Sequence, residues 1–134
     1  MSDGITMPAG RRVGSSVAII LALALAVWWV MMAIVTWRAV TVMGLNASGD
    51  IFFGDLAHPW RAQFNIDFFG HLLLVAAWIV ARAATPLRGM AFAILAIVGG
   101  SLFSFAYMIA VLVQSRGNLR LFLLGRQARA ITSL

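Results

Sequence analysis

The fold is decided by residues 55–82, which read DLAHPWRAQFNIDFFGHLLLVAAWIVAR. The segment is long and apolar enough to cross a membrane, yet it carries Asp67 and His71 where hydrocarbon would surround them. Its apolar residues favour insertion by about 3 to 6 kcal/mol together, whereas a central aspartate costs about 2.5 to 3.5 kcal/mol. This narrow margin predicts a membrane helix over residues 60–82 that neighbouring helices shelter from lipid.

Asp67 and His71 are four residues apart, so a helix places them on one face with carboxylate and imidazole in contact. Gln63 precedes them on that face, and toward the other end of the helix the face carries the small residues Gly70 and Ala77. Polar and small residues favour contact with another helix over contact with lipid. We therefore expect this stripe to pack inside the bundle.

Composition places the chain among integral membrane proteins. Of its 134 residues, 63% are hydrophobic and 10% are charged. The absence of cysteine excludes disulfides, a thiol nucleophile and cysteine-ligated metals. No polar domain exists to display a basic surface, so nucleic-acid binding has no support. All ten basic residues are arginine, a usage typical of GC-rich bacterial genomes, and we expect the bacterial cytoplasmic (inner) membrane as the location.

The apolar pattern predicts an all-α membrane protein with three transmembrane helices, at about 17–37, 60–82 and 89–114. They form a single transmembrane domain over residues 1–134. Residues 1–16 are expected to be a flexible N-terminal tail, and residues 118–134 an interfacial C-terminal segment with a short helix that Asn118 caps and Gly125 interrupts.

The third span contains a row of small residues at spacings of three or four: Gly89, Ala93, Ala96, Gly100 and Ser104. Such a row lets a second helix approach closely, and the expected partner is the stripe of Gly70 and Ala77. Ser101, Ser104 and Tyr107 also bring hydroxyls to this helix, and we expect one of them to donate to Asp67.

Arginines mark the ends of the predicted spans, where they can reach lipid phosphates. The candidate headgroup ligands are Arg38, Arg61, Arg82, Arg88, Arg116 and Arg120. Three spans would put the first loop and the C-terminal tail on one side, and the N-terminus and the second loop on the other. Counting arginines on each side slightly favours a cytoplasmic C-terminus.

Two readings of the acid and imidazole pair stay open. In one, a hydrogen-bonded pair holds the helices in register. In the other, the pair is a site for a quinone, a haem, a chlorophyll-type pigment or a relayed proton. The candidate contact residues for a ligand or a partner are Gln63, Asp67, Gly70, His71 and Tyr107. We assign no catalytic residue and no metal ligand, because no recognisable catalytic or metal-binding motif is present, and no motif implies a cofactor.

Phe52 and Phe53, the block HPWRAQFNIDFFGHLLLVAAWIVAR, the pair Gly99 and Gly100, and a GRQ tail follow one another over residues 50–127. This order resembles small bacterial membrane proteins of unknown function, which have three or four spans. The resemblance implies no activity. Small size and the lack of a soluble domain favour an accessory or structural subunit of a membrane complex. Its expected partners are the lipid bilayer and either other membrane proteins or further copies of itself.

Overall fold

The computed structural model describes residues 13–125 and residue 128, and within them every regular element is helical. The predicted tail and interfacial segment lie partly outside these residues. The elements, in chain order, are α1 (Val13–Met43), α2 (Ala47–Gly54), the 3-10 helix η1 (Asp55–Ala57), α3 (Pro59–Arg82), α4 (Pro86–Gln114) and α5 (Leu119–Leu124). Helices α1, α3 and α4 are each long and apolar enough to cross a membrane, which confirms the predicted fold class.

The helix boundaries follow local chemistry. Pro59 and Pro86 begin α3 and α4, where a missing backbone N–H costs nothing. Helix α1 extends beyond the predicted 17–37 because no breaker occurs before Gly44, whose φ of 80° ends it. The connection between the first two predicted spans is mostly helical, because the end of α1, α2 and η1 occupy it. Asn118 caps α5 as expected, its side-chain oxygen accepting from the amide of Leu121 at 3.1 Å.

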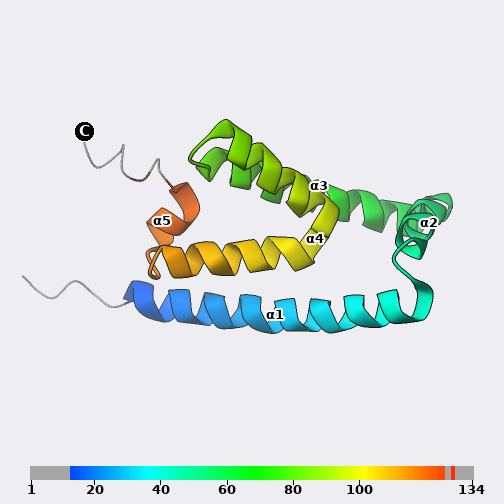
Figure 1. The fold of residues 1–134 in the computed structure, drawn as a ribbon, viewed down its shortest axis with the longest axis horizontal. Coiled ribbons are helices and arrows are strands. Elements are labelled where there is room, and N and C mark those ends of the chain that lie inside the picture. The colour runs from blue at the N-terminus through cyan, green and yellow to red at the C-terminus, as the bar shows by residue number, and fades with distance from the viewer. Residues whose placement is uncertain (1–12, 126–127, 129–134) are drawn as a thin grey trace, which may run out of the picture.

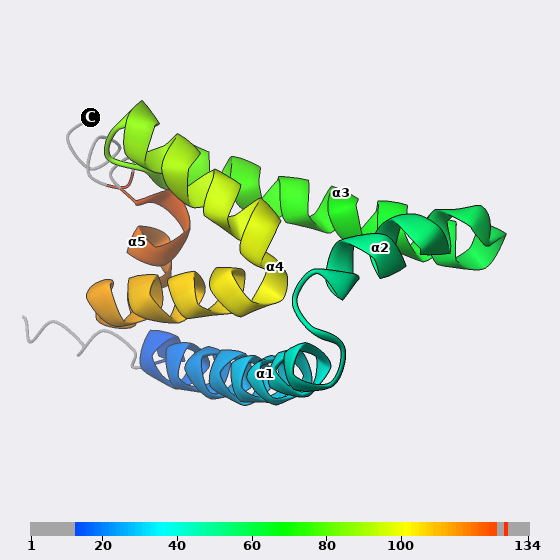
Figure 2. The same cartoon turned by 45° about the vertical axis from the view of Figure 1, so that its right-hand side comes forward.

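Helix α4 is bent back on itself at Gly100, whose φ of 56° and ψ of −143° are not helical. The rings of Phe92 and Tyr107 consequently lie 5.5 Å apart between centroids. Fifteen residues of straight helix would separate them by about 22 Å along the axis. Helix α4 is thus a hairpin of two arms, residues 86–99 and 101–114, as Figures 1 and 2 show.

Each arm of α4 packs on a different long helix (Figure 2). The first arm lies along α3, with Gly89, Ala93 and Ala96 buried. The second arm lies along α1, where a core cluster joins the start of α1, the end of α4 and α5 through Ala18, Val111, Leu112 and Phe122. The hairpin therefore fills the space between α1 and α3.

The predicted row of small residues on α4 is largely buried, including Ser104. Its expected partner was wrong. The buried side chains of α3 are Asn65, Leu72, Ala76 and Ile79, while Gly70 and Ala77 are exposed. Small residues on one helix leave room for large side chains of the other. The face of α3 with large apolar side chains therefore packs on the small residues of α4, and the face with Gly70 and Ala77 does not.

The hairpin brings both ends of α4 to the same end of the molecule (Figure 1). Helix α5 is hydrogen-bonded to the end of α3, because Arg82 Nε donates to the carbonyl of Phe122 at 3.1 Å. The indole N–H of Trp78 likewise donates to the carbonyl of Leu123 at 3.1 Å. The expectation that the second loop and the C-terminal tail lie at opposite ends is wrong for residues up to 125.

Candidate functional site

Four of the five predicted contact residues share one exposed face of α3, here called the α3 polar face: Gln63, Asp67, Gly70 and His71. At 100° per residue this face lies opposite the packed face that carries Leu72, Ala76 and Ile79. An added Cβ on Gly70 would meet nothing within 4 Å. The α3 polar face is therefore open to any partner that can reach it.

The imidazole of His71 is held by its own helix. Its Nδ1 lies 2.8 Å from the backbone carbonyl of Asp67 and 3.8 Å from the carboxylate Oδ2 of the same residue. A carbonyl only accepts, so Nδ1 carries the hydrogen of that bond. In the neutral ring this leaves the lone pair on Nε2, the nitrogen that is free to ligate or accept.

The prediction that this pair is buried between helices of the chain was wrong. The side chain of Asp67 is 61% exposed and that of His71 is 70% exposed. No hydroxyl of the described residues donates to Asp67. Ser104 Oγ is buried without a hydrogen-bond partner, and the hydroxyl of Tyr107 instead accepts from Arg82 Nη1 at 3.0 Å.

Tyr107, the fifth predicted contact residue, belongs to a cluster around Arg82 at the open end of the α4 hairpin. The guanidinium carbon of Arg82 lies 5.1 Å from the ring centre of Trp78 and 5.7 Å from that of Tyr107. The Trp78 ring also packs against Phe122 at 5.4 Å. This cluster joins α3, the second arm of α4 and α5, and it was missed because its members are far apart in sequence.

The candidate headgroup arginines fall into two groups. At one end, Arg61 forms an ion pair with Asp55 at 2.8 Å while its side chain stays 65% exposed, and Arg38 is exposed. At the other end, Arg88, Arg116 and Arg120 are exposed and Arg82 is half-buried. Asn65 lies one helical turn after Arg61 on α3. Its side chain donates to the carbonyl of Phe52 at 3.1 Å, which links α2 to α3.

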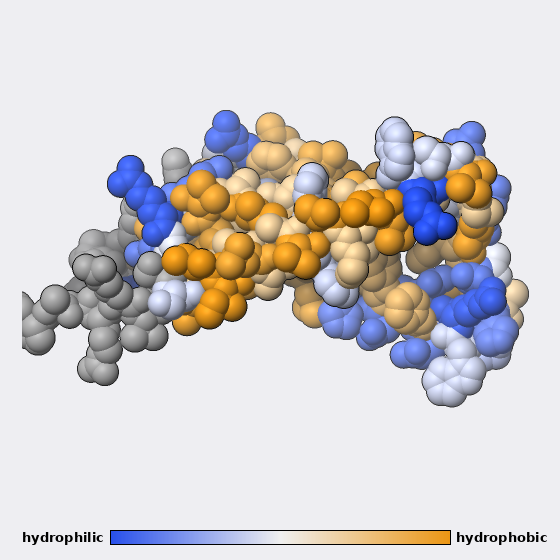
Figure 3. Space-filling model, turned by 90° about the horizontal axis from the view of Figure 1, so that it is seen from below, coloured by the Kyte–Doolittle hydropathy of each residue, from blue (hydrophilic) through white to orange (hydrophobic). Residues whose placement is uncertain are grey.

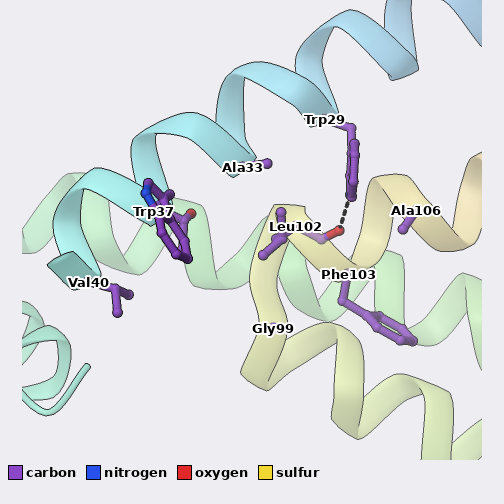
Figure 4. Close-up of a pocket in the computed structure, with 9 residues that line it drawn as sticks. Trp29, Ala33, Trp37, Val40, Gly99, Leu102, Phe103 and Ala106 are labelled. Carbon is purple, nitrogen blue, oxygen red and sulfur yellow. Dashed lines mark hydrogen bonds between the residues drawn. The ribbon is translucent and has the colours of Figure 1, made fainter. Parts of the chain in front are cut away.

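A groove of about 520 Å³ lies between α1 and the bend of α4 (Figure 4). Trp29 reaches across from α1 and donates its indole N–H to the carbonyl of Leu102 at 2.9 Å. Trp37 and Val40 line the α1 side. A second cavity of about 640 Å³ adjoins the bend and is lined by Phe52, Phe68 and Phe69 among others. The position of Trp29 inside an apolar run was the available signal for such a contact.

The donors for a metal ion are not assembled among residues 13–125. No three side chains of the histidine, aspartate or glutamate type gather in that part of the chain. Any metal there would need most of its ligands from elsewhere, for example from a macrocycle to which His71 supplies one nitrogen.

A model of a family described as "Protein of unknown function (DUF1475)" matches residues 9–125. The chain belongs to this family. The match begins before α1 and runs to the end of α5, so the DUF1475 region includes both the α3 polar face and the α4 hairpin. No curated protein and no solved structure matches the chain. The expected resemblance to proteins of unknown function is confirmed, and DUF1475 membership brings no activity with it.

Proposed function

We propose that this chain is a non-catalytic subunit of a bacterial cytoplasmic-membrane complex, and that it binds a transmembrane helix of another membrane protein through the α3 polar face. One observation supports this most directly. Asp67 and His71 stand on the outside of an apolar helix with side chains 61% and 70% exposed. None of the described helices that pack on α3 covers them.

The depth of the pair makes its exposure significant. Asp67 lies about 12 Å and His71 about 18 Å from the start of α3, a helix about 36 Å long. His71 is therefore at the middle of the span, and Asp67 lies one third of the way along it, inside the hydrocarbon region. Leaving a charged aspartate in hydrocarbon costs about 2.5 to 3.5 kcal/mol, which a covering protein surface removes.

The shape of the face suits a helix. Gly70 lies between the two polar side chains and has open space above it. A glycine there lets the backbone of a second helix approach closely, while Gln63, Asp67 and His71 offer hydrogen bonds across the contact. The outer surface of α1 is largely apolar, with hydrophilic side chains gathered mainly near the ends of the molecule (Figure 3), as expected for lipid contact.

Extraction from the native membrane in mild detergent tests the proposal. We expect the chain to migrate with a partner protein and Asp67→Leu to retain less of that partner. One interhelical hydrogen bond contributes about 0.6 to 1.7 kcal/mol, so association should weaken roughly three- to twentyfold. A wild-type chain that migrates alone would overturn the proposal, whereas a complex of identical copies would identify the partner helix as its own.

Gly70→Leu and Ala91→Leu form a matched pair for the same experiment. Both add bulk at exposed positions, but only Gly70 lies on the α3 polar face. We expect Gly70→Leu to release the partner and Ala91→Leu to retain it, with thermal stability of the isolated chain similar in both. Equal retention by the two variants would contradict the proposed contact.

A second candidate is a ligand site, and the geometry of His71 favours it. Nδ1 is tied to a backbone carbonyl, which orients Nε2 outward as in histidines that ligate haem or a chlorophyll-type magnesium. A quinone or a relayed proton would use the same pair. Visible absorption bands in protein from its native host, lost in His71→Ala, would support a pigment. If the pair serves only to hold a partner, Asp67→Asn should alter stability of the complex while sparing any proton-linked activity.

A further inference from the structure

The open end of the α4 hairpin contains a pocket that the α3 polar face does not involve. Its volume is about 370 Å³. The lining combines two arginines and a glutamine with aromatic and aliphatic side chains: Arg82, Arg88, Gln114, Phe92, Phe103 and Tyr107. The pocket exists because α4 turns back at Gly100, which brings residues 88 and 114 to the same opening.

Among the described residues, no acidic side chain compensates the charge in this pocket. Arg82 donates two of its five N–H groups to neutral oxygens, the carbonyl of Phe122 and the hydroxyl of Tyr107. Arg88 forms no hydrogen bond or ion pair with the described part of the chain and is exposed. The lining residues that the structure describes include no carboxylate. On α3 the nearest aspartate is Asp67, fifteen residues or about 22 Å from Arg82.

The position of the pocket matches the headgroup layer of a bilayer. Each arm of α4 has 14 residues and is about 21 Å long, so the bend lies in the hydrocarbon and the opening at the membrane surface. Arg116 and Arg120, both exposed, stand at the same end of the molecule. Below the arginines the walls are apolar, formed by Phe92, Phe103 and neighbouring aliphatic side chains.

We propose that this pocket binds the phosphate of an anionic phospholipid between Arg82 and Arg88, with the glycerol and upper acyl carbons against the aromatic wall. Arginine suits phosphate because its planar guanidinium offers paired donors. The apolar wall favours a lipid over a free phosphate ion, because the ion has no apolar group to contact that wall. The lipid pocket shares no residue with the partner contact proposed for α3, so an experiment can refute one proposal and leave the other standing.

The test follows thermal unfolding of the full chain in detergent by tryptophan fluorescence, while phosphatidylglycerol, phosphatidylcholine or inorganic phosphate is titrated in. We expect saturable stabilisation by phosphatidylglycerol, with little effect of the other two. Arg88→Gln should weaken the phosphatidylglycerol affinity about fivefold, because one arginine near an anionic lipid contributes about 1 kcal/mol. Arg88→Lys keeps the charge but loses the paired donors, so its affinity should lie between those of the wild type and Arg88→Gln.

Arg120→Gln is the matched control, since it removes the same charge from the same end of the molecule but does not line the pocket. It should bind phosphatidylglycerol as the wild type does. Equal weakening by Arg88→Gln and Arg120→Gln would overturn the proposal in favour of diffuse surface attraction. Equal stabilisation by inorganic phosphate or by phosphatidylcholine would overturn the anionic-lipid assignment.

Discussion

At the scale of single residues, Gly100 has the largest effect on the architecture. Its φ of 56° with ψ of −143° belongs to a region that side chains with a Cβ essentially do not adopt. Its neighbour Gly99 is also constrained, because a Cβ there would lie 2.8 Å from the Cβ of Phe103. Two adjacent glycines thus permit a bend that most other residue pairs would prevent.

Gly100→Ala should therefore destabilise the chain by about 1 to 3 kcal/mol, the usual cost of a residue held in a strained backbone region. Denaturant unfolding in mixed micelles measures this, with Gly70→Ala as the control. Gly70 has helical geometry and open space, so an alanine there should be neutral or stabilise by up to about 1 kcal/mol. Similar losses for both variants would contradict a special role for Gly100.

The same scale explains why the sequence misplaced some residues. The spacing of Asp67 and His71 correctly put them on one face, because that depends only on helical periodicity. Which face turns inward depends on the neighbour, and the large apolar side chains of the opposite face gain more by packing on α4. Tyr107 was assigned to the wrong group for a related reason, since its partner Arg82 is 25 residues away.

At the scale of elements, the α4 hairpin departs most from expectation. The sequence predicted a continuous third span from residues 89 to 114, with Gly100 counted as one of a row of small residues. The row is real, but it is divided between two arms that contact α3 and α1 separately. Hydrophobicity alone does not distinguish a long straight helix from two short ones joined at a glycine.

A distance measurement checks the hairpin. Leu87 and Val113 are exposed, one on each arm, and the chain has no cysteine to interfere with labelling. Spin labels at these positions should be far closer than the roughly 39 Å that a straight helix of 26 residues would impose. Labels at Val17 and Met43, both in α1, are the control and should give the full separation of a continuous helix, also about 39 Å. A distribution centred near 39 Å for the first pair would contradict the hairpin.

At the scale of the whole molecule, the fold separates charge between its two ends. Among the described residues, Arg82, Arg88, Arg116 and Arg120 lie at the end that holds both ends of α4 and α5, close to the start of α1. The opposite end holds two arginines, Arg38 and Arg61, together with Asp50 and Asp55. By the positive-inside rule, the first end is expected to face the cytoplasm.

Single cysteines test this topology in intact cells. Thr85→Cys and Arg120→Cys should share one side of the membrane, the cytoplasmic one, and resist an impermeant thiol reagent. Ser48→Cys should react with it. If α4 crossed the membrane as a straight span, Thr85 and Arg120 would instead lie on opposite sides, so different labelling of these two positions would contradict the arrangement.

The sequence by itself determined the class of protein, the three long apolar segments, and the common face of Asp67 and His71. These depend on local composition and periodicity, which are properties of consecutive residues. The tertiary structure alone decided that α4 folds back, that the polar face of α3 points outward, and that Arg82 and Arg88 share a pocket. Those outcomes depend on the competition between helix faces for contact and on one backbone conformation at Gly100, neither of which follows from residue spacing.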